Sequence, residues 1–265
     1  MGLVASRKSA RFALGGLAES AVVNVVLEAR GLVKDYKRAR AVDGVDLTIR
    51  AGERVALLGA NGAGKTTTLL MLLGAITPDA GTVEMLGRRL PGARSEAMEQ
   101  VGFAAGYLPL PEHLRVREVL SVFAGLHGIA DAGPAIAAGL DRFRIGHLAD
   151  AMATELSSGQ RTLVGIVKAT LHRPRLLVLD EPTASLDPDV AHRVREGLER
   201  IHAEDGTALL VTSHNMSDVE RVCERVVFLA KGRVVADGTA EEVAAQFGRD
   251  DLEQVFLHLA AEEEV

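Results

Sequence analysis

Residues 59–67 read Gly-Ala-Asn-Gly-Ala-Gly-Lys-Thr-Thr, and this stretch decides the fold. It fits the spacing G-x-x-x-x-G-K-[S/T] and stands between an apolar run, Arg54–Leu58, and a helical pattern, Lys65–Leu73. In such a strand–loop–helix unit, glycines let successive backbone N–H groups turn toward phosphate oxygens, and the helix adds its positive N-terminal end. The stretch therefore predicts a phosphate-binding loop in an α/β protein.

Two side chains of this loop have the chemistry that a nucleoside triphosphate requires. Lys65 supplies a point charge at the β- and γ-phosphates, and the Thr66 hydroxyl can ligate Mg²⁺. The alternative is a glycine-rich turn without a ligand, but the pattern arises by accident in only about one chain in a hundred or fewer. The other nucleotide contacts predicted from the loop are Gly59, Ala60, Asn61, Gly62, Ala63, Gly64 and Thr67.

A second motif, Leu-Leu-Val-Leu-Asp-Glu-Pro at residues 176–182, ends an apolar strand with two acids. Because open parallel sheets collect ligands at the carboxyl ends of their strands, we expect Asp180 to lie beside a Mg²⁺ ion at the phosphate loop. Glu181, one residue further, can orient or deprotonate an attacking water. On its own this motif is also an ordinary strand exit, and the phosphate loop upstream gives it its meaning.

A third motif, Leu-Ser-Ser-Gly-Gln-Arg at residues 156–161, opens an apolar helix. Serines and a glycine at a helix N-terminus form a second phosphate receptor. One chain does not need two receptors for one γ-phosphate, so the motif predicts that each subunit offers this loop to the nucleotide on its partner. The predicted contacts are Ser157, Ser158, Gly159 and Gln160.

With these three motifs the sequence resembles the ATP-binding-cassette (ABC) superfamily, whose signature reads Leu-Ser-Gly-Gly-Gln. Here Ser158 stands at the first signature glycine, while Ser157 and Gly159 are in place. The resemblance runs from about Val26 to Leu259 and implies ATP and Mg²⁺ as ligands. It also implies the fold class: an α/β P-loop NTPase core with an N-terminal antiparallel β subdomain and an inserted helical subdomain.

Further residues follow from the resemblance. Asp187 falls at the family's D-loop, which touches the opposite subunit, and His214 falls at its switch histidine, a γ-phosphate contact. Tyr36 stands where the family stacks an aromatic ring on adenine, although a packing role is the alternative. One family element is missing, a Gln after the strand Val101–Ala105, because Gly106 or Tyr107 occupies its position.

The resemblance implies a domain organisation. We expect a disordered extension over residues 1–24, a nucleotide-binding domain over 25–240 with its helical insert at about 107–160, and a C-terminal helical tail over 241–265. The extension carries three basic residues before any acid, so a targeting peptide is the alternative. In the tail, apolar residues at i, i+3, i+4 and i+7 predict packing on the core in preference to partner binding; they are Leu252, Val255, Phe256 and Leu259.

Composition narrows the functional class. The 265 residues carry a net charge of −6, and no basic stripe supports nucleic-acid binding. Cys223 is the only cysteine, which excludes an internal disulfide and fits a buried small side chain. No apolar run approaches the roughly 18 residues of a membrane span. If the protein works at a membrane, a different chain must cross it.

Three later stretches look like the ATPase subunits of two-component exporters: residues 115–120, 213–222 and 251–257. This resemblance implies a homodimer that closes around ATP, drives a separate membrane permease and lies peripherally on the cytoplasmic face of the membrane. The alternative is a soluble cassette ATPase that drives assembly, repair or translation without transport. Such cassettes usually carry two cassettes in one chain or long coiled-coil insertions, and this sequence has neither.

Overall fold

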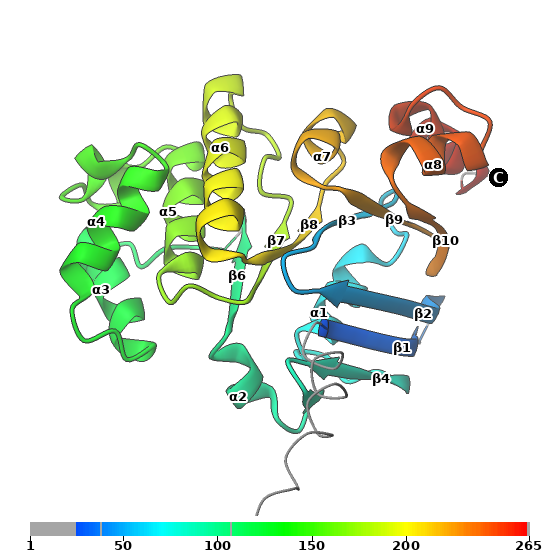
Figure 1. Cartoon of the computed structure of the whole chain (residues 1–265), viewed down its shortest axis with the longest axis horizontal. Coiled ribbons are helices and arrows are strands. Elements are labelled where there is room, and N and C mark those ends of the chain that lie inside the picture. Colours follow the sequence, from blue (N-terminus) through cyan, green and yellow to red (C-terminus); the bar gives the residue numbers. More distant parts are fainter. Residues whose placement is uncertain (1–24, 38, 107, 264–265) are drawn as a thin grey trace, which may run out of the picture.

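The computed structural model describes residues 25–37, 39–106 and 108–263. The predicted extension at 1–24 and the alternative Gln position, Tyr107, lie outside the described residues. Figure 1 shows two sheets, with most of the helices on the side of the larger sheet that faces away from the smaller one. The expected α/β class with an antiparallel sheet and a helical insert is confirmed.

The larger sheet has the order β10-β9-β3-β8-β7-β6. Its strands from β9 to β6 run parallel, and β10 is antiparallel at the edge. The bounds are β3 Arg54–Leu58, β6 Val101–Ala105, β7 Leu176–Asp180, β8 Ala208–Thr212, β9 Arg225–Ala230 and β10 Arg233–Gly238. The strands β7 and β8 are buried at every residue, which is why they read as continuous apolar runs.

Alternate residues of β7 pack into different clusters of buried hydrophobic side chains, one on each side of the large sheet. Leu177 and Leu179 pack with α5 (Ser158–Thr170) and α6 (Pro188–Asp205), whereas Leu176 and Val178 pack toward α1 (Lys65–Leu72) and the second sheet. Figure 1 agrees, since α5, α6 and α7 (Met216–Val222) lie on one side of the large sheet. The parallel sheet is therefore the middle layer of the molecule.

The second sheet has the order β2-β1-β4-β5 and is wholly antiparallel. Its strands are β1 Val25–Tyr36, β2 Ala39–Arg50, β4 Ala80–Met85 and β5 Arg88–Leu90. Apolar runs alone predict short strands at 25–27 and 45–49 around a turn-rich segment, and one strand over 79–90. The first two bounds are wrong because the polar residues of β1 and β2 lie on the solvent side, and register shifts interrupt their alternation. The third is wrong because Leu86 and Gly87, both with positive φ, turn the chain between β4 and β5.

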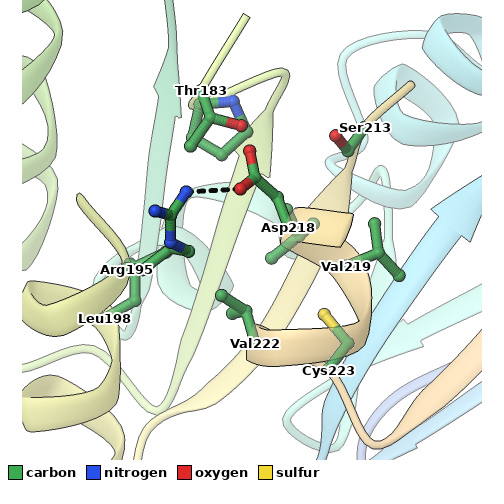
Figure 2. Close-up of a pocket in the computed structure, with 10 residues that line it drawn as sticks. Thr183, Arg195, Leu198, Ser213, Asp218, Val219, Val222 and Cys223 are labelled. Carbon is green, nitrogen blue, oxygen red and sulfur yellow. Dashed lines mark hydrogen bonds and ion pairs between the residues drawn. The ribbon is translucent and has the colours of Figure 1, made fainter. Parts of the chain in front are cut away.

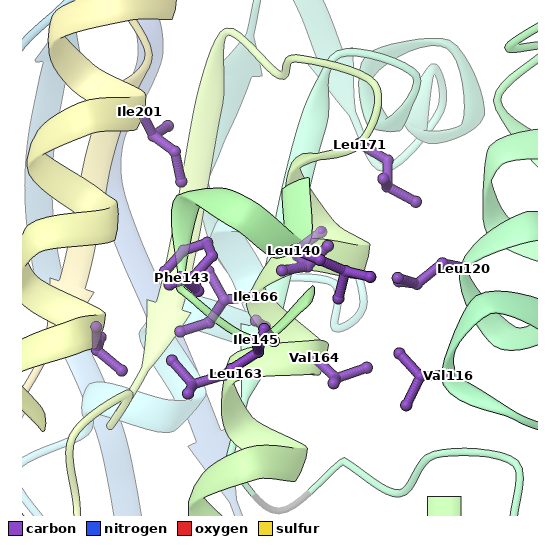
Figure 3. Packing of buried hydrophobic residues seen from close by; sticks show 14 of the residues in the cluster. Val116, Leu120, Leu140, Phe143, Ile145, Leu163, Val164, Ile166, Leu171 and Ile201 are labelled. Atoms are coloured by element: carbon purple, nitrogen blue, oxygen red, sulfur yellow. The ribbon is translucent and has the colours of Figure 1, made fainter. Parts of the chain in front are cut away.

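The helical region consists of α3 (Val116–Leu126), α4 (Ala132–Arg142), two short 3₁₀ turns (Gly146–Leu148 and Ala153–Glu155) and α5. Figure 3 shows buried side chains of this region in one cluster, with Val116 and Leu120 of α3 on one side of Leu140 and Phe143, 1% exposed, on the other. Helical spacing alone would place Leu126 on the same apolar face as Val116. It is 75% exposed instead, because α3 ends at this residue and Gly128 turns the chain away with φ +67°.

The C-terminal helices are α8 (Ala240–Gln246) and α9 (Leu252–Glu263). Leu252, Val255 and Leu259 are buried against β9, α7 and α8, so the packing interpretation of the tail is confirmed. Cys223 is partly buried between two cores, and burial raises the pKa of its thiol to about 12. A short helix, α2 (Arg94–Met98), completes the fold. Within the described residues, every helix is too short or too polar to span a membrane.

Candidate active site

The phosphate loop connects β3 to α1, and its backbone requires glycine at two positions. Gly59 has φ +150°, and a Cβ there would lie 2.4 Å from the Leu229 carbonyl oxygen. Gly64 has φ +102°, and a Cβ there would lie 2.4 Å from the Ala41 carbonyl oxygen. Both neighbours are backbone atoms, so no side chain fits at either glycine. The loop is therefore pressed between β9 and β2.

The lysine of this loop folds back over it. Lys65 Nζ donates to the carbonyl oxygens of Gly59 at 2.6 Å and Ala60 at 3.0 Å. Gly64 is the N-cap of α1, and Thr66 is exposed in the helix's first turn. A phosphate-sized anion at this helix end would meet the lysine charge, backbone N–H groups and a hydroxyl together.

Strand register brings the acids to the same edge of the sheet. Leu57 pairs with Thr212, and Thr212 pairs with Asp180, so the three residues share one row across β3, β8 and β7. Gly59 stands two residues beyond that row on β3, and Glu181 stands one residue beyond it on β7. The sequence-predicted acids and the phosphate loop thus lie at one edge of neighbouring strands.

Thr212 ties the two acids together. Its hydroxyl donates to Asp180 Oδ1 at 2.6 Å and accepts the Glu181 backbone N–H at 3.0 Å. Asp180 is 6% exposed and Thr212 is fully buried. A buried carboxylate requires such a hydrogen-bond partner. Sequence reasoning missed this role of Thr212. It could have been inferred, because Asp180 and Thr212 each end an apolar strand and the ends of adjacent parallel strands lie side by side.

Glu181 has a left-handed backbone, with φ +53°, which is rare for a residue with a side chain. Its side chain contacts the histidine that the resemblance selected, with 2.6 Å between His214 Nδ1 and Glu181 Oε2. Both side chains are partly exposed, at 29% for Glu181 and 59% for His214. The strained turn therefore presents the carboxylate to solvent beside the imidazole.

The signature loop is built from its own hydrogen bonds. Ser157 is the N-cap of α5, where its hydroxyl accepts the Gln160 N–H at 3.2 Å and its N–H donates to Gln160 Oε1 at 2.9 Å. This reciprocal pair is a capping box. Gly159 lies against Val190 of α6, and a Cβ at Gly159 would lie 2.9 Å from Val190 Cγ1. Ser157 and Ser158 are exposed at the start of α5.

Two other predicted residues lie on exposed turns. Asp187 is the exposed N-cap of α6 and follows Ser185, which has φ +57°. Tyr36 is 49% exposed at the end of β1, where it pairs with Ala39. Two residues along β2, Ala41 touches Gly64, so the hairpin that carries Tyr36 lies beside the phosphate loop.

Gly106, one of the two positions at which the resemblance places the missing glutamine, lies next to the acids. Ala105 of β6 pairs with Asp180, and Gly106 follows it. A Cβ at Gly106 would find only the Glu181 carbonyl oxygen at 3.9 Å and Thr162 Oγ1 at 4.0 Å. A small hollow between β6 and α5 adjoins it, lined by Gly106, Thr162, Ile166 and Pro182 among others.

The strand–loop–helix unit and the acids in register with it define a P-loop nucleotide hydrolase. A family model described as "ABC transporter" matches residues 42–184, more than half of the chain. The Nod factor export ATP-binding protein I of Burkholderia orbicola (strain AU 1054) is 37% identical over 230 residues, which cover 86% of this chain and 75% of that protein.

Solved structures agree. The ATP-binding subunit of an ABC transporter is 31% identical with a TM-score of 0.81, over 89% of this chain and 99% of that one. A dimeric post-hydrolysis state of an ATP-binding cassette with ADP and Pi shares the fold at 23% identity, with a TM-score of 0.73 over 80% of this chain and 98% of that one. The chain belongs to the ABC transporter family and is a nucleotide-binding ATPase cassette.

Proposed function

We propose that this chain is the ATPase subunit of an ABC exporter, which dimerises around ATP and drives a separate membrane permease. The observation that carries the hydrolytic site is the row Leu57–Thr212–Asp180, which sets Glu181 and His214 beside the phosphate loop. Export rests on the relative named for Nod factor export. In this proposal the permease, and not this chain, determines which substrate is transported.

ATP binds at the phosphate loop in this proposal. Lys65 exchanges its bonds to Gly59 and Ala60 for the β- and γ-phosphates, and Tyr36 stacks on the adenine from the adjacent hairpin. The remaining loop contacts are backbone N–H groups of residues 59–64 and the hydroxyls of Thr66 and Thr67. These residues form a cradle whose tightest points, Gly59 and Gly64, leave no room for a side chain.

The donor atoms fit Mg²⁺, which prefers oxygen ligands from one or two protein groups together with substrate phosphates. Thr66 offers a hydroxyl and Asp180 a carboxylate, and the latter is held by Thr212. Mg²⁺ supplies charge neutralisation at the phosphates when it is bound. The protein's task is to hold the Asp180 carboxylate in one orientation.

Glu181 is the proposed general base for the attacking water, because its carboxylate is partly exposed at the end of β7. His214 orients that carboxylate through Nδ1, at 2.6 Å from Oε2. The second ring nitrogen, Nε2, is then available to donate to the γ-phosphate when the imidazole is protonated. The backbone of Glu181 is fixed by Thr212, so the base keeps one direction.

We propose that the signature loop serves a second copy of this chain. Ser157, Ser158 and Gly159 complete the partner's γ-phosphate site, and Gln160 keeps Ser157 in place. Asp187 contacts the opposite subunit from the N-terminus of α6. The dimeric cassette of the same fold is consistent with a dimer. The domain division stands as proposed: the nucleotide-binding domain at 25–240, the helical insert at about 107–160 and the tail at 241–265.

Purified variants test the hydrolytic roles. Lys65→Ala loses ATP affinity, whereas Glu181→Gln keeps ATP binding and loses turnover. Glu199→Gln is the matched control, because Glu199 is an exposed acid on α6 away from the site. A Glu181→Gln protein with normal turnover contradicts the proposed base.

Two further measurements test the assembly. Glu181→Gln with ATP and Mg²⁺ sediments as a dimer, and the same protein without nucleotide sediments largely as a monomer. Co-purification from detergent-solubilised membranes with the product of a neighbouring six-span permease gene tests the exporter assignment and the peripheral location at the cytoplasmic face. Copurification with ribosomes or repair complexes instead of the permease favours the soluble alternative.

A further inference from the structure

A buried ion pair joins two helices that begin at the candidate site. Arg195 of α6 donates through Nη1 to Asp218 Oδ1 of α7. Their side chains are only 15% and 10% exposed. Figure 2 shows the two groups facing each other across the gap between the helices. Buried charges of this kind hold their partners in one geometry, because leaving either charge alone is strongly unfavourable.

Both helices are extensions of site loops. The chain passes from His214 directly into Asn215, the N-cap of α7, whose side chain accepts the Asp218 N–H at 3.3 Å. On the Arg195 side of the ion pair, α6 starts from Asp187, at the end of the turn that follows Glu181. The ion pair thus connects the first turn of the histidine's helix to the helix that follows the base.

The pocket around the pair lies under the same two loops. Its lining includes Pro182 and Thr183, directly after Glu181, and Ser213, directly before His214. Figure 2 places Thr183 and Ser213 on the same side of the pair, with Val222 and Cys223 on the opposite side. Any shift of α7 relative to α6 therefore displaces the loop that carries His214.

The imidazole itself has little packing to hold it. His214 is 59% exposed, and its side chain contacts Glu181, with 2.6 Å between Nδ1 and Oε2. Its place is therefore set by the backbone on which it stands, and that backbone is the entry to α7. From this geometry we infer that Arg195, through Asp218, is a positioning residue that holds His214 against Glu181. The inference rests on the proposed hydrolytic roles of these two residues.

The test compares steady-state ATP hydrolysis of Arg195→Met, His214→Ala and the double variant. Arg195→Met should lower kcat by about tenfold to a hundredfold, since small misplacements of site groups have effects of that order. KM for ATP should stay within about twofold, because the phosphate loop is untouched. The double variant should be no slower than His214→Ala alone, because without the imidazole no side chain is left for Arg195 to position.

A matched control separates positioning from general damage. Arg142 forms a comparably buried pair with Asp205, at 2.6 Å, between α4 and the far end of α6. Arg142→Met should lower the melting temperature but leave kcat unchanged. Asp218→Asn and Arg195→Lys keep part of the contact and should give intermediate kcat values, and they provide the measurement if Arg195→Met does not fold.

Three results overturn the inference: wild-type kcat in Arg195→Met, losses that multiply with those of His214→Ala, or an equal kcat loss in Arg142→Met. A failure of the proposed function is recognised differently. In that case His214→Ala and Glu181→Gln themselves hydrolyse ATP at the wild-type rate.

Discussion

Replacing Thr212 by Val removes one hydroxyl and keeps the volume and β-branched shape of a fully buried strand residue. That hydroxyl donates to Asp180 Oδ1 at 2.6 Å and accepts the Glu181 N–H at 3.0 Å. Loss of a hydrogen bond to a buried charged group destabilises by about 1.5–3 kcal/mol. The Glu181 N–H retains the Thr212 carbonyl oxygen at 3.2 Å, so its share of the loss is smaller.

The consequence for turnover follows from the same figure. If about 2 kcal/mol of preference for the present Asp180–Glu181 arrangement is lost, the equilibrium ratio between that arrangement and its alternatives falls by roughly 30-fold. We expect kcat for Thr212→Val to fall by up to about that factor and the Mg²⁺ requirement to rise, because Asp180 is the proposed metal ligand. A Mg²⁺ titration of ATPase activity, with urea unfolding in parallel, measures both effects.

Thr207 offers a matched control at the other end of the same strand. It is also fully buried, and its hydroxyl donates to the Pro174 carbonyl oxygen at 2.8 Å. Thr207→Val should destabilise by about 1 kcal/mol and leave kcat and the Mg²⁺ curve unchanged. Equal kcat values for the two variants would refute the role given to Thr212.

Three other substitutions have expected outcomes. A side chain fits at Gly106, since a Cβ there would lie no closer than 3.9 Å to the described residues. Gly106→Gln should therefore raise basal ATPase or tighten the Mg²⁺ requirement. An unchanged Mg²⁺ titration of ATPase activity rejects a metal contact at this position. Burial lowers the pKa of His172 to about 4, so the unfolded chain takes up its proton first as pH falls below about 6.5. The full shift would cost about 2 kcal/mol of stability between pH 7 and 5, and because the side chain is partly exposed to solvent we expect a loss of about 1 kcal/mol. His172→Gln should remove that loss from denaturant unfolding curves, unlike the exposed control His192→Gln. Gly197→Ala should destabilise by about 1–3 kcal/mol, because the added Cβ would lie 2.1 Å from Phe143 Cε1; a wild-type melting temperature contradicts this.

The sequence was sufficient for the parallel core because its strands are buried on both faces. Runs such as Leu176–Leu179 have no competing interpretation once a phosphate loop precedes them. The antiparallel sheet was less predictable. In β1 and β2 the exposed residues alternate with buried ones and bulges break the period, so only the most apolar ends were recognised.

The candidate site shows the same division between local and distant information. The phosphate loop and the acid pair are contiguous motifs, and the sequence named them directly. The roles of Thr212, Arg195 and Asp218 became visible only from strand register and helix packing. Thr212 bonds Asp180, 32 positions away in the sequence, and Arg195 bonds Asp218, 23 positions away. Thr212 was visible beside His214 in the sequence, but no local pattern separates a strand-ending threonine with a catalytic neighbour from one without.

The absent glutamine gives Thr212 more weight in this chain than the family pattern alone would suggest. Ala105, Asp180 and Thr212 share one row of the sheet, so Asp180 has neighbours on two sides, β6 and β8. On the β6 side the row is followed by Gly106, which has no side chain to offer. On the β8 side Thr212 bonds Asp180 and the backbone of Glu181 at once. Orientation of both acids therefore depends on the β8 side, where His214 also begins the path to Asp218 and Arg195.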